Sequence, residues 1–223
     1  MDWSPFLLSF KLGLLTAATL LFIGIPLAYA LSFMNWRGKR LVQAVIALPM
    51  VLPPTVLGFY FLVVFSPESA VGGFLKHYFD LHLVFSFIGL LLGSIIYSLP
   101  FMVQPIQNSF EQLPPHMLQF ARVLGKSKWA VFRKVILPNT KKGIATGLVL
   151  CFAHTLGEFG LVLMIGGNIP DETRVASIAI YEFVELMEMD QANQYALILL
   201  FVSFLVLIFI YSLGSNSKNL IRW

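Results

Sequence analysis

The amino-acid sequence predicts an all-α integral membrane protein with five transmembrane helices. Of its 223 residues, 58% are hydrophobic and only 12% are charged, whereas a soluble domain carries about a quarter of charged residues. Apolar residues also gather in five runs, and each is close to the roughly 20 residues that cross a bilayer. We therefore treat residues 1–223 as a single transmembrane domain.

The expected spans are defined by apolar runs that end at charged or turn-forming residues. A further stretch, residues 174–188, is amphipathic and too short to cross, so we expect an interfacial helix there on the outer side. The five spans are expected at residues 6–33, 41–65, 83–106, 143–166 and 195–214.

The distribution of charge predicts the orientation. Residues 34–41, 107–142 and 215–223 hold 12 of the 15 Lys and Arg residues, and the remaining connections with the N-terminal end hold 9 of the 11 Asp and Glu residues. Cytoplasmic loops are enriched in Lys and Arg. We therefore expect an external N-terminus and a cytoplasmic C-terminus, whereas a sixth span would place Lys218 and Arg222 outside.

A helical hairpin is expected over residues 114–138, within the longest basic connection. The two prolines that open it favour the first turn of a helix, and Gly125 is suited to end that helix in a left-handed conformation. Ser127 is a suitable N-cap for a second helix over 128–136, which Pro138 should stop. Such a hairpin is a rigid cytoplasmic protrusion; the alternative is a basic interfacial hairpin that holds anionic membrane lipid.

The hairpin resembles the "EAA" loop of ABC-importer permeases. The pattern comprises Ala121, Gly125 and, after nine residues, Val135 to Pro138; Gln119 and Phe120 stand where Glu and Ala are usual in that family. The resemblance implies that a separate ATPase subunit grips this hairpin, with Ala121 and Gly125 at the contact surface. The residues expected to couple to the ATPase are Pro115, Leu118, Gln119, Ala121, Arg122, Leu124, Gly125 and Lys126.

The second expected span contains three prolines near its middle, including Pro53 and Pro54, followed by Thr55. Proline leaves backbone carbonyls unpaired, and hydrocarbon cannot satisfy them. A kinked helix that lines a translocation pathway is one interpretation, and a kink for packing alone is the other. Because five spans enclose little space, we expect the pathway to form between two copies of the chain.

The fourth expected span carries His154 and Glu158 one helical turn apart. Ionisable residues at that depth must face the protein interior or water, so both are pathway candidates. A carboxylate would repel a divalent oxyanion by about 4 kcal/mol per pair of unit charges at 4 Å. We therefore expect Glu158 to accept hydrogen bonds from backbone N–H groups or from His154. A self-contained structural pair and a proton relay are the other interpretations.

No catalytic residue, metal site or nucleic-acid partner is expected. The four histidines lack ligand spacing. Residues 125–127, Gly-Lys-Ser, match the end of a phosphate-binding loop, but Phe120 replaces its leading glycine and no strand precedes it. The chain is therefore expected to bind no cofactor, and ATP and Mg²⁺ would be bound by a partner ATPase.

Over nearly its whole length the chain resembles permease subunits of the sulfate, molybdate and tungstate importer group. The segments concerned are residues 48–58, 156–160 and 167–174 with 179–181. The resemblance implies a type I importer permease in the bacterial inner membrane, built as a homodimer with two ABC ATPase subunits and a periplasmic oxyanion-binding protein. Molybdate is the expected substrate, with sulfate, thiosulfate or tungstate as alternatives, and a proton-coupled secondary transporter is the alternative of a different class.

The outer segment after the fourth span is expected to receive the binding protein. Two glycines at 166–167 should break the span, and Pro170 should keep the polar residues after it exposed. Its acids would repel a free oxyanion, so the anion should arrive enclosed in a carrier with a basic rim. The residues expected to dock the carrier are Asn168, Asp171, Glu172, Arg174, Glu182 and Glu185.

Overall fold

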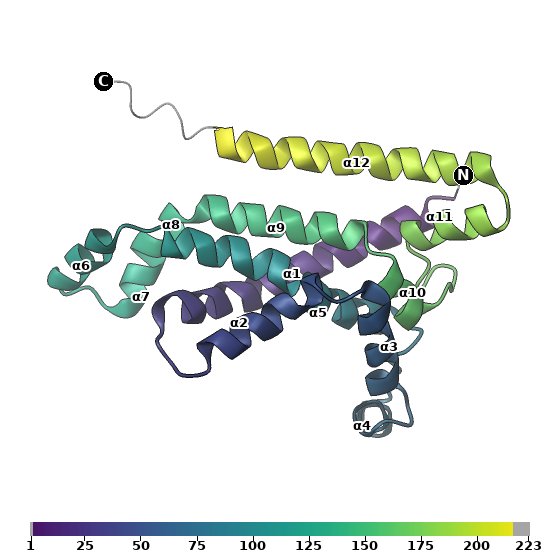
Figure 1. The fold of residues 1–223 in the computed structure, drawn as a ribbon, viewed down its shortest axis with the longest axis horizontal. Helices are drawn as coiled ribbons and strands as arrows, with labels where there is room; N and C mark the ends of the chain where they lie inside the picture. Colours follow the sequence, from purple (N-terminus) through teal and green to yellow (C-terminus); the bar gives the residue numbers. More distant parts are fainter. Residues whose placement is uncertain (1, 216–223) are drawn as a thin grey trace.

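The structure, a computed structural model, describes residues 2–215, and all the regular secondary structure that it describes is helical. The longest helices run side by side along the long axis of the molecule, as Figure 1 shows. They are α1 (Ser4–Phe33), α5 (Phe87–Glu111), α9 (Lys141–Leu156) and α12 (Met189–Ser215). Of these, α1, α5 and α12 are each long and apolar enough to cross a membrane.

The other two expected spans are each broken into two helices. In the second, α2 (Lys39–Ala47) continues into the short helix η1 (Leu48–Met50) and then turns by 108° into α3 (Pro54–Phe65). In the fourth, α9 turns by 61° into α10 (Gly160–Gly166). Three continuous and two broken candidates are compatible with the five expected spans. The kink expected at the prolines of the second span is a sharp break between two helices, whereas the break within the fourth span, after Leu156, was not expected.

Several helix ends differ from the expected ones. Helix α5 begins at Phe87, where the Ser86 hydroxyl accepts the Gly89 N–H at 3.2 Å, and continues to Glu111. Helix α11 (Ala176–Glu185) is shorter than the expected helix at 174–188, and α12 begins at Met189 instead of residue 195. Met187, the middle one of the three residues between them, has a positive φ of 59° where the chain reverses direction.

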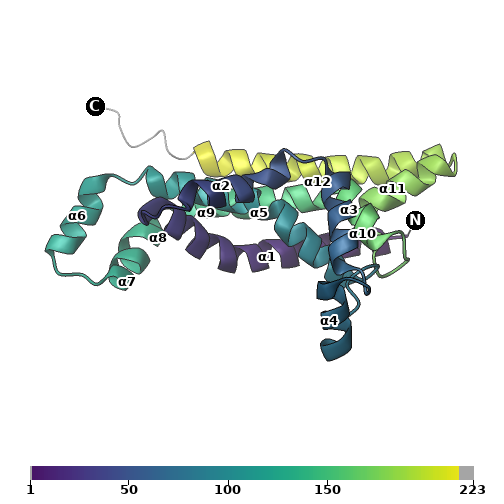
Figure 2. The same ribbon diagram turned by 60° about the horizontal axis from the view of Figure 1, so that its bottom comes forward.

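One helix was not expected at all. Helix α4 (Ala70–Phe79) follows α3, and the hydroxyl of Ser69 accepts the Gly72 N–H at 2.9 Å as its N-cap. Its last turn is closed by Asp80, which has a positive φ of 51°. In the turned view of Figure 2, α3 and α4 project to one side of the bundle.

The two ends of the bundle are different in kind. Helices α6 (Pro115–Val123), α7 (Lys128–Val131) and α8 (Leu137–Asn139), with the π-helical stretch η2 (Phe132–Ile136) between the last two, lie at the hairpin end. The N-terminus, α10 and α11 lie at the opposite end, and α12 returns toward the hairpin end (Figures 1 and 2). The basic residues expected beyond residue 215, Lys218 and Arg222, lie outside the described residues.

Close packing of α5 on α9 fixes the middle of the bundle. A methyl group on Gly143 would lie 2.3 Å from the Cβ of Ser109, and one on Gly147 would lie 2.9 Å from the carbonyl oxygen of Met102. These glycines therefore let two helices of the same chain approach closely. Large buried side chains, Met102 and Ile106 among them, fill the core beside this contact.

Candidate functional site

The turn of the hairpin has the local geometry that its sequence predicts. Gly125 has a φ of 67°, and the N–H of Lys126 donates to the carbonyl of Ala121 at 3.2 Å, which closes α6. The hydroxyl of Ser127 accepts the N–H of Ala130 at 3.2 Å and caps α7. Both predicted caps are confirmed.

The second arm of the hairpin is longer than predicted, because Pro138 does not stop it. The chain widens into the π-helical stretch η2 and then remains helical through Asn139. A wider turn accommodates the ring and the missing N–H of proline. The arm ends instead at Thr140, whose hydroxyl donates to the carbonyl of Ile136 at 2.8 Å, and α9 begins at the next residue.

The structure separates the expected contact residues into exposed and buried ones. Ala121 is only 8% exposed and faces the interior of the hairpin, which corrects its expected place on the contact surface. Leu118 is half-buried, and the side chain of Arg122 lies outside the described atoms. The exposed members of the set are Pro115, Gln119, Leu124, Gly125 and Lys126.

An apolar surface on the hairpin was missed. Phe120 and Val123 of α6 and Leu124 directly after it are spaced three and four residues apart, and they are between 67% and 84% exposed. Helical spacing places these three residues on one face. A helical projection of residues 115–124 could have found this surface, which is of the kind that marks protein contacts.

The breaks in the two bent spans lie against each other. A methyl group on Gly160, the first residue of α10, would lie 3.1 Å from the Cβ of Pro54 and 3.3 Å from Cγ2 of Thr55. One on Gly58 of α3 would lie 2.6 Å from the Cβ of Met164. Two motifs that are about 100 residues apart in the sequence therefore form one structural unit, in which Pro53 and Thr55 are exposed and Pro54 is half-buried.

Glu158 sits in the break of the second of these spans and is 4% exposed. Its carboxylate accepts a hydrogen bond from the hydroxyl of Ser94 on α5 at 2.8 Å, and its backbone carbonyl accepts one from Ser177 on α11 at 2.6 Å. Glu158 thus connects α5, the break and α11. The donor to the carboxylate is Ser94, instead of the backbone N–H groups or His154 that were expected.

His154 is held separately, because the helix ends at Leu156 before it reaches Glu158. The Nδ1 atom of His154 lies 3.0 Å from the hydroxyl of Ser98, and its ring stacks on Phe101 with 4.0 Å between centroids. The helix that carries His154 is interrupted before Glu158, yet both side chains face the same strip of α5, because their partners Ser98 and Ser94 lie one helical turn apart. Ser94 and Ser98, polar residues four apart in an apolar span, were the signal for their true partners.

The loop between α10 and α11 is closed by its own residues. Gly167 has a φ of 62° and ends α10. The hydroxyl of Thr173 donates to the carbonyl of Gly166 at 2.7 Å and accepts the N–H of Ile169 at 3.0 Å. The loop keeps three of the expected docking residues exposed, namely Asn168, Asp171 and Glu172.

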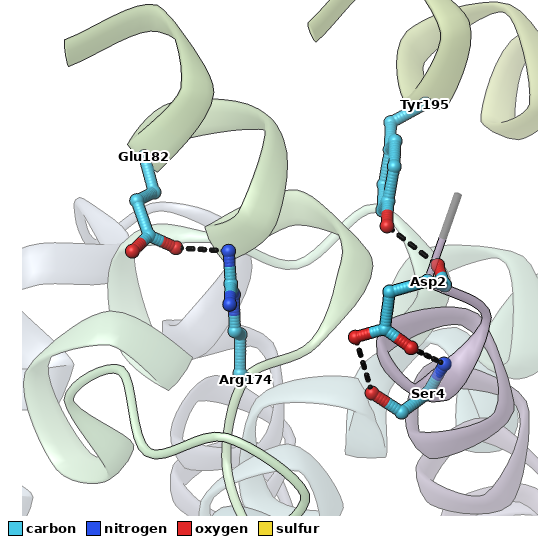
Figure 3. Close-up of polar contacts among 5 residues, drawn as sticks. All are labelled: Asp2, Ser4, Arg174, Glu182 and Tyr195. Atoms are coloured by element: carbon cyan, nitrogen blue, oxygen red, sulfur yellow. Dashed lines mark hydrogen bonds and ion pairs between the residues drawn. The ribbon is translucent and has the colours of Figure 1, made fainter. Parts of the chain in front are cut away.

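Two other expected docking residues, Arg174 and Glu182, form an ion pair with each other, drawn in Figure 3. Glu182 is therefore not a free charge on this face. Glu185 is exposed and accepts a hydrogen bond from the hydroxyl of Tyr181 at 2.5 Å.

The start of α1 lies at the same end of the bundle. The backbone N–H and the hydroxyl of Ser4 donate to the two carboxylate oxygens of Asp2 at 2.9 and 2.8 Å, and together they hold the pKa of this carboxyl below its ordinary value. The Tyr195 hydroxyl donates to the backbone carbonyl of Asp2 at 2.5 Å (Figure 3). These bonds fasten the N-terminus to α12 beside the Arg174 ion pair.

Comparisons with known proteins agree with this arrangement. The family model "Binding-protein-dependent transport system inner membrane component" matches residues 20–217. The molybdenum transport system permease protein ModB of Azotobacter vinelandii is 44% identical over 211 residues, which cover 95% of this chain and 93% of that protein. The sulfate transport system permease protein CysT of Escherichia coli is 34% identical over 195 residues, which cover 86% of this chain and 69% of that protein.

A solved structure shares the fold. It is that of a bacterial alginate ABC transporter in complex with an alginate pentasaccharide-bound periplasmic protein, and it aligns with a TM-score of 0.73 and 18% identity over 96% of this chain and 80% of that chain.

Proposed function

Because the chain belongs to the family of binding-protein-dependent transport system inner membrane components, we propose that it is the permease subunit of an ATP-driven molybdate importer. The observation that carries the proposal is its 44% identity, over 95% of the chain, to a molybdenum transport permease. Its three continuous apolar helices and two bent pairs suit a multi-pass protein of the bacterial inner membrane. The chain supplies no catalysis, and ATP and Mg²⁺ are bound by the partner.

In this proposal the hairpin is cytoplasmic and docks on the ATPase subunit. Its support is the exposed apolar face of α6 on a segment that carries basic residues and no acid between Glu111 and Glu158. The two caps make the hairpin a unit that moves as a whole. Because Thr140 joins the hairpin directly to α9, a displacement of the hairpin is transmitted to the broken segment around Glu158.

The pathway lies between two copies of the chain, beside the paired breaks. Pro53 and Thr55 are exposed there, whereas Glu158 is turned inward and held by Ser94. This arrangement keeps the carboxyl group of Glu158 out of the path of the anion, which a charged carboxylate would repel. Weak contacts along the path suit transport, since a tight site would slow release. Substrate selection then belongs to the periplasmic binding protein, and sulfate or tungstate is the alternative substrate.

Transport assays separate an ATP-driven importer from a proton-coupled transporter. The permease is reconstituted in proteoliposomes with its ATPase subunit, and loaded binding protein is supplied on the outer face. We expect molybdate uptake that requires enclosed ATP and persists when a protonophore collapses the proton gradient. Uptake that continues without ATP and stops with the protonophore would overturn the proposal.

The same assay decides the role of Glu158. Glu158→Gln keeps the shape of the side chain and an oxygen that accepts the Ser94 bond, but it cannot carry a proton. We expect it to retain most of the uptake. Complete loss of uptake in a variant that assembles normally would favour a proton relay through this residue.

Carrier docking on the outer face is tested best at Glu185, because Glu182 is occupied by its ion pair with Arg174. We expect Glu185→Lys to weaken carrier binding, with a larger loss at low salt, where surface charges are screened less. Basal ATP hydrolysis should not change. Lys76→Glu, another charge reversal in an outer segment, is the control. Carrier affinity that is indifferent to Glu185→Lys and to salt would remove this face from the docking site.

A further inference from the structure

A groove runs between the end of α1 and the second arm of the hairpin. Two neighbouring cavities, of about 360 and 400 Å³, share Tyr29, Met34 and Lys128 in their walls. The first is also lined by Lys126 and by apolar residues of the hairpin core. The second is lined by Pro26 and by the rings of Trp129 and Phe132, which stack with 5.6 Å between centroids. One part of the groove is thus basic and the adjoining part is apolar and aromatic.

The apolar part continues a surface of α1 that belongs in the hydrocarbon. Phe22 is 79% exposed, and the residues that follow it at intervals of four, Pro26, Ala30 and Met34, lead along α1 into the groove. Residues spaced by four lie on one face of a helix. An acyl chain lying along this face would therefore enter the groove without leaving the membrane.

The basic part has the charge that an acidic headgroup requires. Lys126 and Lys128 line it, and no Asp or Glu is among the described residues that line either cavity. The sequence from 112 to 157 contains no acidic residue at all, so these lysines have no carboxylate nearby along the chain. Tyr29 and Trp129 complete the set of aromatic and basic side chains that is typical of a membrane interface.

We propose that this groove binds one anionic phospholipid, with its phosphate beside Lys126 and Lys128 and an acyl chain between α1 and the Trp129–Phe132 pair. The lipid would join the hairpin to α1 and so hold the base of the hairpin at the membrane surface. The site requires only that α1 spans the membrane, and it does not depend on the identity of the transported anion or on the ATPase.

Trp129 provides a direct probe, because it lies in the groove. The full-length chain carrying Trp3→Phe, Trp36→Phe and Trp223→Phe keeps Trp129 as its only tryptophan, and it is placed in nanodiscs that contain brominated phosphatidylglycerol or brominated phosphatidylcholine at equal, low fraction. We expect stronger quenching by the brominated anionic lipid. Lys128→Gln should lower the binding preference for the anionic lipid over phosphatidylcholine about fivefold, which is the effect of one lysine near an anionic surface.

Two controls isolate the groove. Lys142→Gln removes a nearby exposed lysine that does not line either cavity, and it should leave the preference unchanged. A chain with Trp3 as its only tryptophan, at the opposite end of α1, should be quenched equally by both lipids, which also shows that the chain is inserted. In native mass spectrometry, the wild-type chain should retain an anionic lipid that the double variant Lys126→Gln, Lys128→Gln loses.

Equal quenching of Trp129 by the two lipids would overturn the proposal, because it shows hydrocarbon contact without a headgroup site. Absence of quenching would overturn it as well, since the groove would then be closed to lipid. Neither result bears on ATP-driven uptake, so failure here is distinguishable from failure of the proposed function.

Discussion

Gly125→Glu is expected to abolish the stimulation of ATP hydrolysis by the loaded binding protein while leaving the chain in the membrane. The φ of Gly125 is 67°. This left-handed backbone conformation raises the conformational energy of a residue with a side chain by about 1–2 kcal/mol. A methyl group at this position would have no atom of the same chain within 4 Å. The added glutamate would therefore project outward, into the expected contact with the ATPase, where it introduces bulk and charge. Stimulated ATP hydrolysis by the purified complex measures the effect.

The matched control is Gly125→Asn, because asparagine tolerates the left-handed conformation better than most residues and adds no charge. We expect this variant to keep a substantial part of the stimulation. If Gly125→Glu were stimulated as strongly as the wild type, the hairpin would not be the coupling element.

The second large effect is expected at the contact between the two broken spans. Gly58→Ala would place a methyl group 2.6 Å from the Cβ of Met164 and 3.3 Å from the Cα of Leu161. Backbone on α10 cannot yield as a flexible side chain can, so α3 and α10 must move apart. Overpacking of this kind typically lowers the free energy of unfolding by about 1–3 kcal/mol. We expect a lower melting temperature in detergent and a severe loss of uptake.

The same substitution at Gly157 provides the control. A methyl group there would lie 3.8 Å from the carbonyl oxygen of Ala153 and 3.9 Å from that of His154, which are ordinary contact distances, so Gly157→Ala should be tolerated. Equal stability and uptake for Gly58→Ala and Gly157→Ala would show that the close contact of α3 with α10 does not matter for transport.

Local features of the hairpin could be predicted from sequence because a few neighbouring residues determine them. Gly125 and Ser127 act through their own backbone geometry and capping bonds, and the structure confirms both. Pro138 was misjudged because proline is compatible with a helix that widens first, and η2 provides that widening. Ala121 was misplaced because a motif shows which residues occur together and not which way each side chain points.

The contacts between elements could not be predicted from the sequence, because they depend on how segments that are separate in the chain pack together. The prolines of the second span predict a disturbed helix, but its 108° bend is stabilised by α10, which is distant in the sequence. Glu158 and His154 each pair with a serine of α5, and these contacts depend on how α5 packs against α9 and the break after it. The ion pair between Arg174 and Glu182 likewise depends on how the loop after α10 folds back onto α11.

The central claim is that this chain couples delivery of molybdate to a partner ATPase, and one measurement tests it most directly. The purified complex of permease and ATPase, in nanodiscs, is mixed with periplasmic binding protein that is empty or loaded with molybdate, tungstate or sulfate. The account predicts strong stimulation of ATP hydrolysis by the molybdate-loaded protein and little by the empty one. Hydrolysis that is the same with empty and molybdate-loaded binding protein, or that responds only to the sulfate-loaded protein, would contradict it.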